Sequence, residues 1–285
     1  MLKKPFQFED NYEIIMAASA SGIAYTTQLV YGTLVPNSIL LLTVFLMMWG
    51  VYRINRILDM KEDSLNNPAR IKRLNKTKGK FTLWIPPIIA FLLALILAFV
   101  TNKLAFLVIV IAFLWIIGYS VKIRGFRRIK EVLILKTVYA SIAWGMLVFI
   151  ATFMLSRNIV TSTWSVFLLV VINISINEIM YDIRDMGGDK KSGIHTFPVV
   201  LGLKKSKQIL LALVVIEILL PIVMIYLNYL PLPIIFLPML SVYTYYLIQL
   251  LDTKKSSNFL FNVLVGGEQI LWPIAYLVVL LIIYR

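Results

Sequence analysis

The segment 173–202 has the sequence NISINEIMYDIRDMGGDKKSGIHTFPVVLG. It begins inside an apolar run and leaves that run with three carboxylates, Asp182, Asp185 and Asp189. Carboxylates at the edge of a membrane are costly unless they bind a cation or take part in chemistry there. This pattern therefore indicates a functional acidic cluster at the end of a membrane helix.

A polar stripe leads from this cluster back into the apolar run. Asn173, Asn177, Tyr181 and Asp185 recur every four residues, which places them near one face of a helix. Because polar side chains seldom face acyl chains, we expect this face to border a polar site. The stripe points towards the interior of the membrane, where we expect an acceptor substrate to bind.

Glycines follow the cluster and predict where its helix ends. Gly187, Gly188 and Gly193 are expected to release the helix into a turn. His195, the only histidine, lies just beyond them. We interpret it as a turn or capping residue, because the chain has no cysteine or second histidine to complete a transition-metal site.

A second acidic cluster lies near the end of an earlier apolar run. Asn55, Asp59 and Asp63 are spaced at i, i+4 and i+8, so they share one face of a helix. Oxygen ligands of this kind suit Mg²⁺, which proteins hold through one or two carboxylates together with substrate phosphates. The alternative is an exposed helix end on which Arg56 and Lys61 pair with the aspartates.

The composition is that of a polytopic membrane protein. Of 285 residues, 60% are hydrophobic and 15% are charged, and the mean hydropathy is +0.86. A spanning helix needs about 20 apolar residues. The sequence predicts an all-α integral membrane fold of nine such helices around a central cavity, at 12–34, 37–60, 81–100, 103–122, 133–154, 160–182, 206–228, 230–251 and 263–284.

The placement of the charges predicts the orientation. The net charge of +14 would suit nucleic acid, but the basic residues follow the membrane topology instead. With a cytoplasmic N-terminus, every Lys and Arg except Lys103, Arg157 and Arg285 falls on the cytoplasmic side. The same orientation places both acidic clusters there. We therefore expect a multi-pass protein of the cell membrane whose active-site loops are cytoplasmic, with no nucleic-acid partner.

Several other polar residues have two interpretations each. The small residues of the first helix indicate close helix packing, whereas Tyr25 and Gln28 on it would alternatively line an acceptor pocket. Lys136, near the start of the fifth helix, is expected to extend to the membrane interface. Glu217 and Glu268 are intramembrane acids that either serve a functional site or form protonated hydrogen bonds between helices.

The two clusters resemble the motifs of the UbiA-type intramembrane polyprenyltransferase superfamily. That family joins an NxxxDxxxD motif after the second helix to an aspartate motif after the sixth. Here the first motif is Asn55-Arg-Ile-Leu-Asp59-Met-Lys-Glu-Asp63. The second is Tyr181-Asp182-Ile-Arg-Asp185-Met-Gly-Gly-Asp189, and the resemblance covers the whole chain as one domain, 1–285, with catalytic loops at about 55–80 and 182–205.

The resemblance implies Mg²⁺-dependent transfer of a polyprenyl group from an allylic polyprenyl diphosphate to a lipophilic acceptor, with release of diphosphate. The acceptor would be an aromatic or quinone precursor or a glyceryl phosphate lipid. Two Mg²⁺ ions would be held, one by each motif, and the motif aspartates would be catalytic. The implied metal ligands are Asn55, Asp59, Asp63, Asp182, Asp185 and Asp189, the diphosphate-binding residues Arg70, Lys122, Arg124 and Lys190, and the substrate-pocket residues Tyr119, Asn173, Asn177 and Tyr181.

Two other functions share some of these features. A terpene cyclase of the same family would ionise the same diphosphate without an external acceptor. A cation transporter would use the carboxylates as an ion path, but transporters usually place their ion sites near the midplane of the membrane. Both clusters here lie at one edge, which favours the enzyme.

Overall fold

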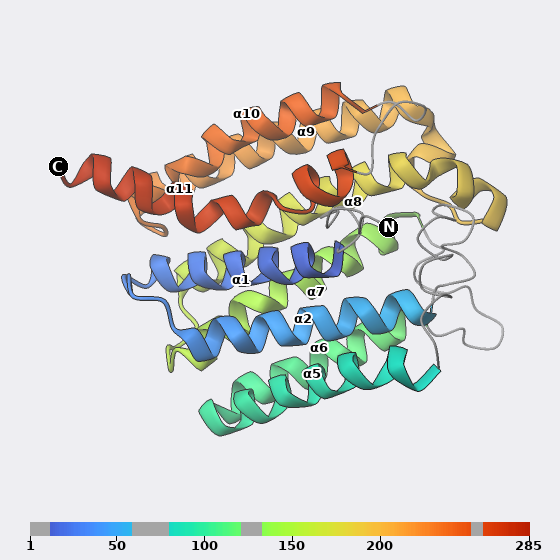
Figure 1. Ribbon diagram of the computed structural model, residues 1–285. Helices are drawn as coiled ribbons and strands as arrows, with labels where there is room; N and C mark the ends of the chain where they lie inside the picture. Colours follow the sequence, from blue (N-terminus) through green and yellow to red (C-terminus); the bar gives the residue numbers. More distant parts are fainter. Residues whose placement is uncertain (1–11, 59–79, 121–132, 252–258) are drawn as a thin grey trace, which may run out of the picture.

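The computed structural model describes residues 12–58, 80–120, 133–251 and 259–285, and all its regular elements in these ranges are helical. The helices pack side by side along a common direction (Figure 1). Their bounds are α1 Tyr12–Val30, α2 Ser38–Leu58, α5 Lys80–Thr101, α6 Lys103–Ser120, α7 Leu133–Met154, α8 Thr161–Ser192, α9 Phe197–Tyr226, η3 Leu232–Ile235, α10 Phe236–Gln249, η4 Leu260–Val265 and α11 Glu268–Ile283.

The helices follow one another around a ring. Each α-helix packs against the next in chain order, and α11 returns to pack against α1. A contact between α1 and α7 closes the middle of the ring, so that α2, α5 and α6 lie on one side and α8 to α11 on the other (Figure 1). This arrangement leaves α1, α2, α7, α8 and the start of α11 to surround the centre.

The start of the first acidic motif lies at the same end of the bundle as the second motif. The C-terminal ends of α2 and α8 lie together there, as do the starts of α1 and α9 (Figure 1). We call this end, which carries Leu58 and Asp189, the aspartate end. The helix directions thus confirm that the first motif begins where the second one lies, although Asp59 and Asp63 fall outside the described residues.

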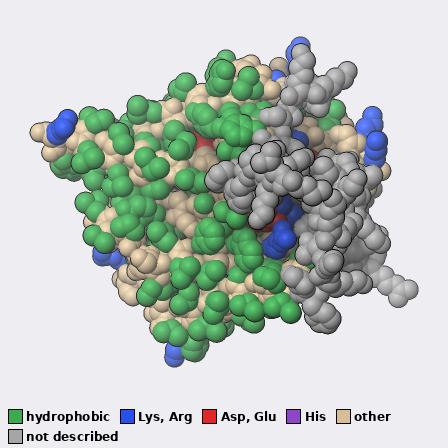
Figure 2. All heavy atoms as spheres, viewed as in Figure 1, with side chains coloured by type: hydrophobic (Ala, Val, Ile, Leu, Met, Phe, Trp, Pro, Cys, Tyr) green, Lys and Arg blue, Asp and Glu red, His purple; other side chains and the backbone are tan. Residues whose placement is uncertain are grey.

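The helices have the length and apolarity of membrane spans. Six of them are long and apolar enough to cross a membrane, and Lys103–Trp115 and Glu268–Ile283 are shorter apolar helices. Hydrophobic side chains cover most of the face seen in Figure 2. Lipid can replace water around such a surface because the backbone hydrogen bonds are satisfied inside each helix. Every predicted span overlaps one of the helices described above.

Two predicted boundaries are wrong at the aspartate end. The helix predicted to end near 182 continues as α8 through Gly187 and Gly188 to Ser192. Gly193 ends it with a left-handed φ of 72°, which glycine adopts without strain. α9 then begins at Phe197 rather than at 206, and it bends at Gly202, whose φ is 78°. His195 lies in the loop between the two helices, as predicted.

The small residues of α1 allow close helix packing, as the first interpretation expected. A Cβ on Gly22 would come within 2.2 Å of the backbone oxygen of Gln269 on α11. Ser19 Oγ donates to the Gly266 carbonyl at 2.6 Å. Tyr25 and Gln28 bond to carbonyls in the turn between α1 and α2, at the end opposite the aspartates, and do not line the cavity described below.

We predict that Gly22→Ala destabilises the bundle by about 2 kcal/mol, because the added methyl group must push α1 away from the α11 backbone. The measurement is the midpoint of thermal unfolding in detergent. Gly187→Ala is the matched control, since a Cβ there meets nothing within 4 Å. An unchanged midpoint for Gly22→Ala would contradict the close α1–α11 contact.

Candidate active site

Two buried carboxylates share one cation at the aspartate end. Asp182 is 2% exposed and Asp189 is 5% exposed, both on the last turns of α8. Lys136 of α7 forms an ion pair with Asp182, and its Nζ lies 3.9 Å from Asp189 Oδ2. The helix explains the pairing, because seven residues advance it by about 700°, close to two full turns. Among the described residues, Asp182 and Asp189 thus both lie beside Lys136 in a water-poor place.

Asp185 has a different environment. It lies three residues after Asp182, about 60° around the helix from the Asp182–Asp189 face. Its carboxylate accepts two hydrogen bonds from Arg184, from Nε at 2.8 Å and from Nη2 at 2.7 Å. The Arg184 guanidinium also lies over the Tyr181 ring, 5.0 Å from its centroid. In the described part of the structure, Asp185 therefore has Arg184 as its partner, whereas Asp182 and Asp189 lie beside Lys136.

The Asp182–Asp189 face suits a divalent cation. Asp182 Oδ2 is buried and has no hydrogen-bond partner in the described part of the chain. Carboxylate oxygens are the ligands that Mg²⁺ prefers, and it is commonly held by one or two of them together with water and phosphate oxygens. No group of three metal-binding side chains occurs among the described residues. Further ligands would have to come from outside these ranges or from a bound substrate.

The first motif is described only at its beginning. Asn55 lies half-buried in the last turn of α2. Beside it, Arg56 is buried and forms an ion pair with Glu13 of α1 at 2.5 Å, and Arg53 reaches the same carboxylate at 3.0 Å. These pairs fix the end of α2 against α1. Asp59 and Asp63, which carry the rest of the motif, lie outside the described residues.

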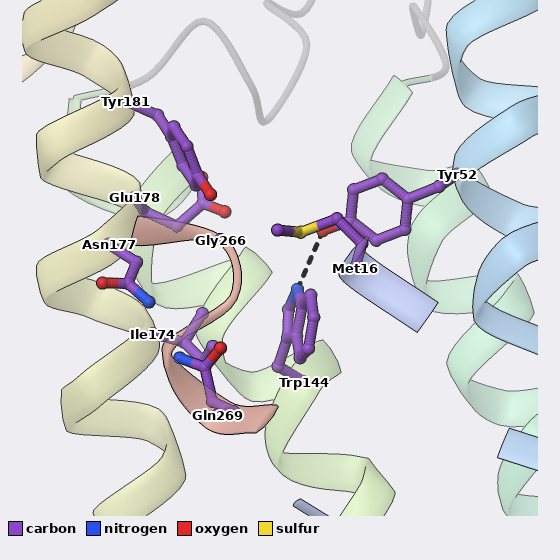
Figure 3. A pocket seen from close by; sticks show the side chains of 9 residues that line it. All are labelled: Met16, Tyr52, Trp144, Ile174, Asn177, Glu178, Tyr181, Gly266 and Gln269. Carbon is purple, nitrogen blue, oxygen red and sulfur yellow. Dashed lines mark hydrogen bonds between the residues drawn. The ribbon is translucent and has the colours of Figure 1, made fainter. Parts of the chain in front are cut away.

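A cavity lies next to the acidic face, towards the middle of the bundle (Figure 3). Its empty volume is about 220 Å³, part of it open to the outside. Asn177 and Tyr181 of the predicted polar stripe line it, and Glu178 places its carboxylate on the same wall (Figure 3). The lining residues are Met16, Tyr52, Trp144, Ile174, Asn177, Glu178, Tyr181, Gly266 and Gln269.

Behind this cavity a hydrogen-bond network joins four helices. Asn173 Nδ2 donates to Glu217 Oε1 of α9 at 2.8 Å and to Glu268 Oε1 of α11 at 2.9 Å. Gln269 Nε2 donates to Asn173 Oδ1 at 2.6 Å. Ser241 of α10 adds a bond to Glu217 Oε2 at 3.0 Å. Glu217 and Glu268 therefore form hydrogen bonds between helices, which is the geometric part of one of the two interpretations.

The structure places the predicted site residues in different surroundings. The structure brings Asp182 and Asp189 together and places Asn177 and Tyr181 at the cavity, whereas Asn173 lies in the network and not among the lining residues. Lys190 is exposed on the last turn of α8. The side chain of Tyr119 on α6 and the residues Asp59, Asp63, Arg70, Lys122 and Arg124 lie outside the described part of the structure.

Sequence reasoning missed two residues of this site. Lys136 was expected to extend to the membrane interface, but it is half-buried and pairs with Asp182. Glu178 was not singled out, although it lies one helical turn before Asp182 and so near the same face. Its spacing from Asp182 was a usable signal. No comparable signal in the sequence indicated that Lys136 pairs with Asp182, because these two residues are 46 positions apart in the chain.

Comparison with known proteins relates the chain to one family. Residues 15–266 match the model of the UbiA prenyltransferase family. A digeranylgeranylglyceryl phosphate synthase of Methanosarcina mazei is 27% identical over 200 residues, covering 67% of this chain and 66% of the relative. One from Saccharolobus solfataricus is 28% identical over 171 residues, covering 59% and 57%. The matched part thus spans less than two thirds of either relative's length.

The fold is similar to solved structures over nearly the whole chain. A UbiA homolog from Archaeoglobus fulgidus, bound to DMAPP and Mg²⁺, has a TM-score of 0.69 at 17% identity and covers 95% of this chain and 98% of that one. A structure of digeranylgeranylglyceryl phosphate synthase has a TM-score of 0.61 at 22% identity and covers 95% and 96%. At these identities the likeness establishes the fold.

We predict that Lys136→Met lowers stability by about 3 kcal/mol in the absence of Mg²⁺, because it leaves Asp182 buried without its cation. The double variant Lys136→Met/Asp182→Asn should recover part of this loss, since it also removes the charge. Thermal unfolding in detergent of wild type, both single variants and the double variant measures the coupling. Additive effects would contradict a buried ion pair.

Proposed function

Because the chain belongs to the UbiA prenyltransferase family, we propose that it transfers a polyprenyl group from an allylic diphosphate to a hydroxyl of a glyceryl phosphate lipid, releasing diphosphate. The observation that carries this proposal is the pair of buried carboxylates, Asp182 and Asp189, beside Lys136. The curated relatives are named digeranylgeranylglyceryl phosphate synthases, which supports a glyceryl phosphate lipid over an aromatic acceptor.

The chemistry requires stabilisation of the leaving diphosphate. The bond between the allylic carbon and the diphosphate oxygen breaks, and its electron pair leaves with the diphosphate. The acceptor oxygen forms the new carbon–oxygen bond and loses its proton. Bound Mg²⁺ would supply positive charge to the diphosphate oxygens. Structures of a UbiA homolog bound to DMAPP or GPP with Mg²⁺ support this choice of metal.

The residues of the aspartate end would bind the metal ions and stabilise the leaving diphosphate. Asp182 and Asp189 would hold one Mg²⁺, and Lys136 lies close enough to add its charge to the diphosphate. Asn55, with Asp59 and Asp63, would hold a second ion, since its helix ends at the same end of the bundle (Figure 1). We keep Asp185 as an outer member of the second motif, because Arg184 occupies its carboxylate.

Further basic residues would bind the diphosphate. Lys190 is exposed one residue after Asp189, where its ammonium group can extend over the acidic face. We assign the same role to Arg70, Lys122 and Arg124 on the strength of their sequence positions.

The cavity would receive the reacting end of the acceptor. Glu178, one helical turn before Asp182, places its carboxylate on the cavity wall and would take up the proton that the acceptor releases as the new bond forms (Figure 3). The rings of Tyr52, Trp144 and Tyr181 would face the allylic cation, which aromatic faces stabilise. Tyr119, on α6, is a further candidate for this role.

We further propose that the protein crosses the cell membrane nine times with its N-terminus and the aspartate end in the cytoplasm. Six long apolar helices and two shorter ones support the membrane location. The distribution of Lys and Arg supports the orientation. Polyprenyl tails would then reach the cavity from the lipid between helices.

Asp59→Ala and Asp182→Ala should each lower Mg²⁺-dependent prenyl transfer by about 100-fold or more, because each removes a carboxylate that holds the charge opposite the diphosphate. The assay incubates purified protein with geranylgeranyl diphosphate and geranylgeranylglyceryl phosphate and detects the ether product by mass spectrometry. Asp252→Ala, which removes a carboxylate outside both motifs, is the control. Full activity of both motif variants would overturn the proposal.

The same assay separates transfer from cyclisation. A transferase releases diphosphate only when the acceptor is present, and the acceptor mass increases by one prenyl group. Release of diphosphate from geranylgeranyl diphosphate alone, with a cyclic hydrocarbon as product, would instead identify a terpene cyclase.

A further inference from the structure

The network behind the cavity fixes the orientation of the Asn173 side-chain amide. This amide has one nitrogen and one oxygen, and the nitrogen lies between the carboxyl oxygens of Glu217 and Glu268. Glu217 Oε1 and Glu268 Oε1 each accept from this nitrogen, so the donor end of the amide faces the two acids. The oxygen of Asn173 must therefore face Gln269. These residues are at most 4% exposed, so water does not compete for the bonds.

The orientation of Gln269 follows from that of Asn173. Because Asn173 presents an oxygen, Gln269 must present its nitrogen, and Nε2 donates at 2.6 Å. The remaining end of the Gln269 amide, Oε1, lies on the side of Trp144, away from α8 (Figure 3). Since Gln269 lines the cavity, the network presents a fixed hydrogen-bond acceptor to whatever binds there.

The backbone around Gln269 is also shaped for this position. The π-helical segment Leu260–Val265 and the turn at Gly266 and Gly267 interrupt the last span before α11 begins. Gly266 lines the cavity, and a Cβ there would come within 2.4 Å of Met16 Cε and 2.8 Å of Tyr181 Oη. π-Helical segments are frequent at functional sites. The break places the first turn of α11 at the cavity wall.

We propose that Gln269 Oε1 accepts a hydrogen bond from the hydroxyl group of the prenyl acceptor. Asn173, Glu217 and Glu268 are positioning residues that hold this oxygen towards the cavity. The inference rests on the proposed function and adds to it the residue that selects a hydroxyl-bearing acceptor. A buried carbonyl oxygen selects a hydroxyl because an analogue without a donor leaves that oxygen unpaired.

The test compares two ligands on the protein without Mg²⁺ or diphosphate. Geranylgeranylglyceryl phosphate carries the free hydroxyl, and its deoxy analogue replaces that hydroxyl with hydrogen. Native mass spectrometry in detergent gives the dissociation constant of each. We expect wild type to bind the hydroxyl ligand at least about 10-fold more tightly than the deoxy ligand. This comparison needs no variant to fold.

Variants then test whether Gln269 causes the difference in affinity between the hydroxyl ligand and its deoxy analogue. Gln269→Leu and Asn173→Leu should bind both ligands within about twofold of each other, the first because the acceptor atom is gone and the second because it is no longer oriented. Glu217→Gln should retain the discrimination, because its amide oxygen can still accept from Asn173 while its nitrogen donates to Ser241. In turnover, Gln269→Leu should raise KM for the acceptor about 10-fold and leave KM for geranylgeranyl diphosphate within about twofold.

The contrary results distinguish failure of this inference from failure of the proposed function. Equal binding of the two ligands to wild type, or unchanged discrimination in Gln269→Leu, would overturn the inference while prenyl transfer itself stands. Loss of discrimination in Glu217→Gln would contradict the orienting role of the network. If wild type neither binds nor prenylates geranylgeranylglyceryl phosphate, the proposed function fails and the inference with it.

Discussion

Asp182 and Asp189 are buried on one face of a long membrane helix, and the described part of the chain places Lys136 beside both. A buried carboxylate in such a place is costly unless a cation lies beside it, and a bound metal ion is one way to supply that charge. The packing of α7 against α8 brings Lys136 to this position. The rest of the bundle holds these two helices in register, and the acidic face is thereby poised to hold a cation next to a diphosphate.

A gradient of polarity runs inward from that face. The ion-paired groups lie at the aspartate end, the cavity with Glu178 and Asn177 follows, and the amides of Asn173 and Gln269 lie deepest, hydrogen-bonded to the carboxyl groups behind them. Charge is needed where the diphosphate leaves, whereas an acceptor hydroxyl can be recognised by an oriented neutral amide, which costs less to bury than a charge. The separation allows the leaving group and the acceptor to be recognised by different chemistry.

The sequence predicted the helices well because a membrane requires each spanning segment to satisfy its own backbone, so apolar runs alone locate them. It failed where side-chain packing decides. Glycine costs a helix only about 1 kcal/mol, and the buried Gly188 and Asp189 keep α8 continuous where two glycines predicted its end. Lys136 pairs with Asp182, 46 positions away on the next helix, and Asp185 pairs with its own neighbour Arg184; neither partner can be read from the spacing of the motif.

The central claim is that Asp182 and Asp189 hold a metal ion against the diphosphate. Crystals grown with Mn²⁺ and an unreactive thio-analogue of geranylgeranyl diphosphate test it directly, because anomalous scattering locates the ion. Our account predicts a Mn²⁺ peak about 2.1 Å from carboxylate oxygens of both residues, with the analogue's phosphate oxygens completing its coordination. Mn²⁺ bound away from both carboxylates, with Asp182 still paired to Lys136 alone, would contradict it.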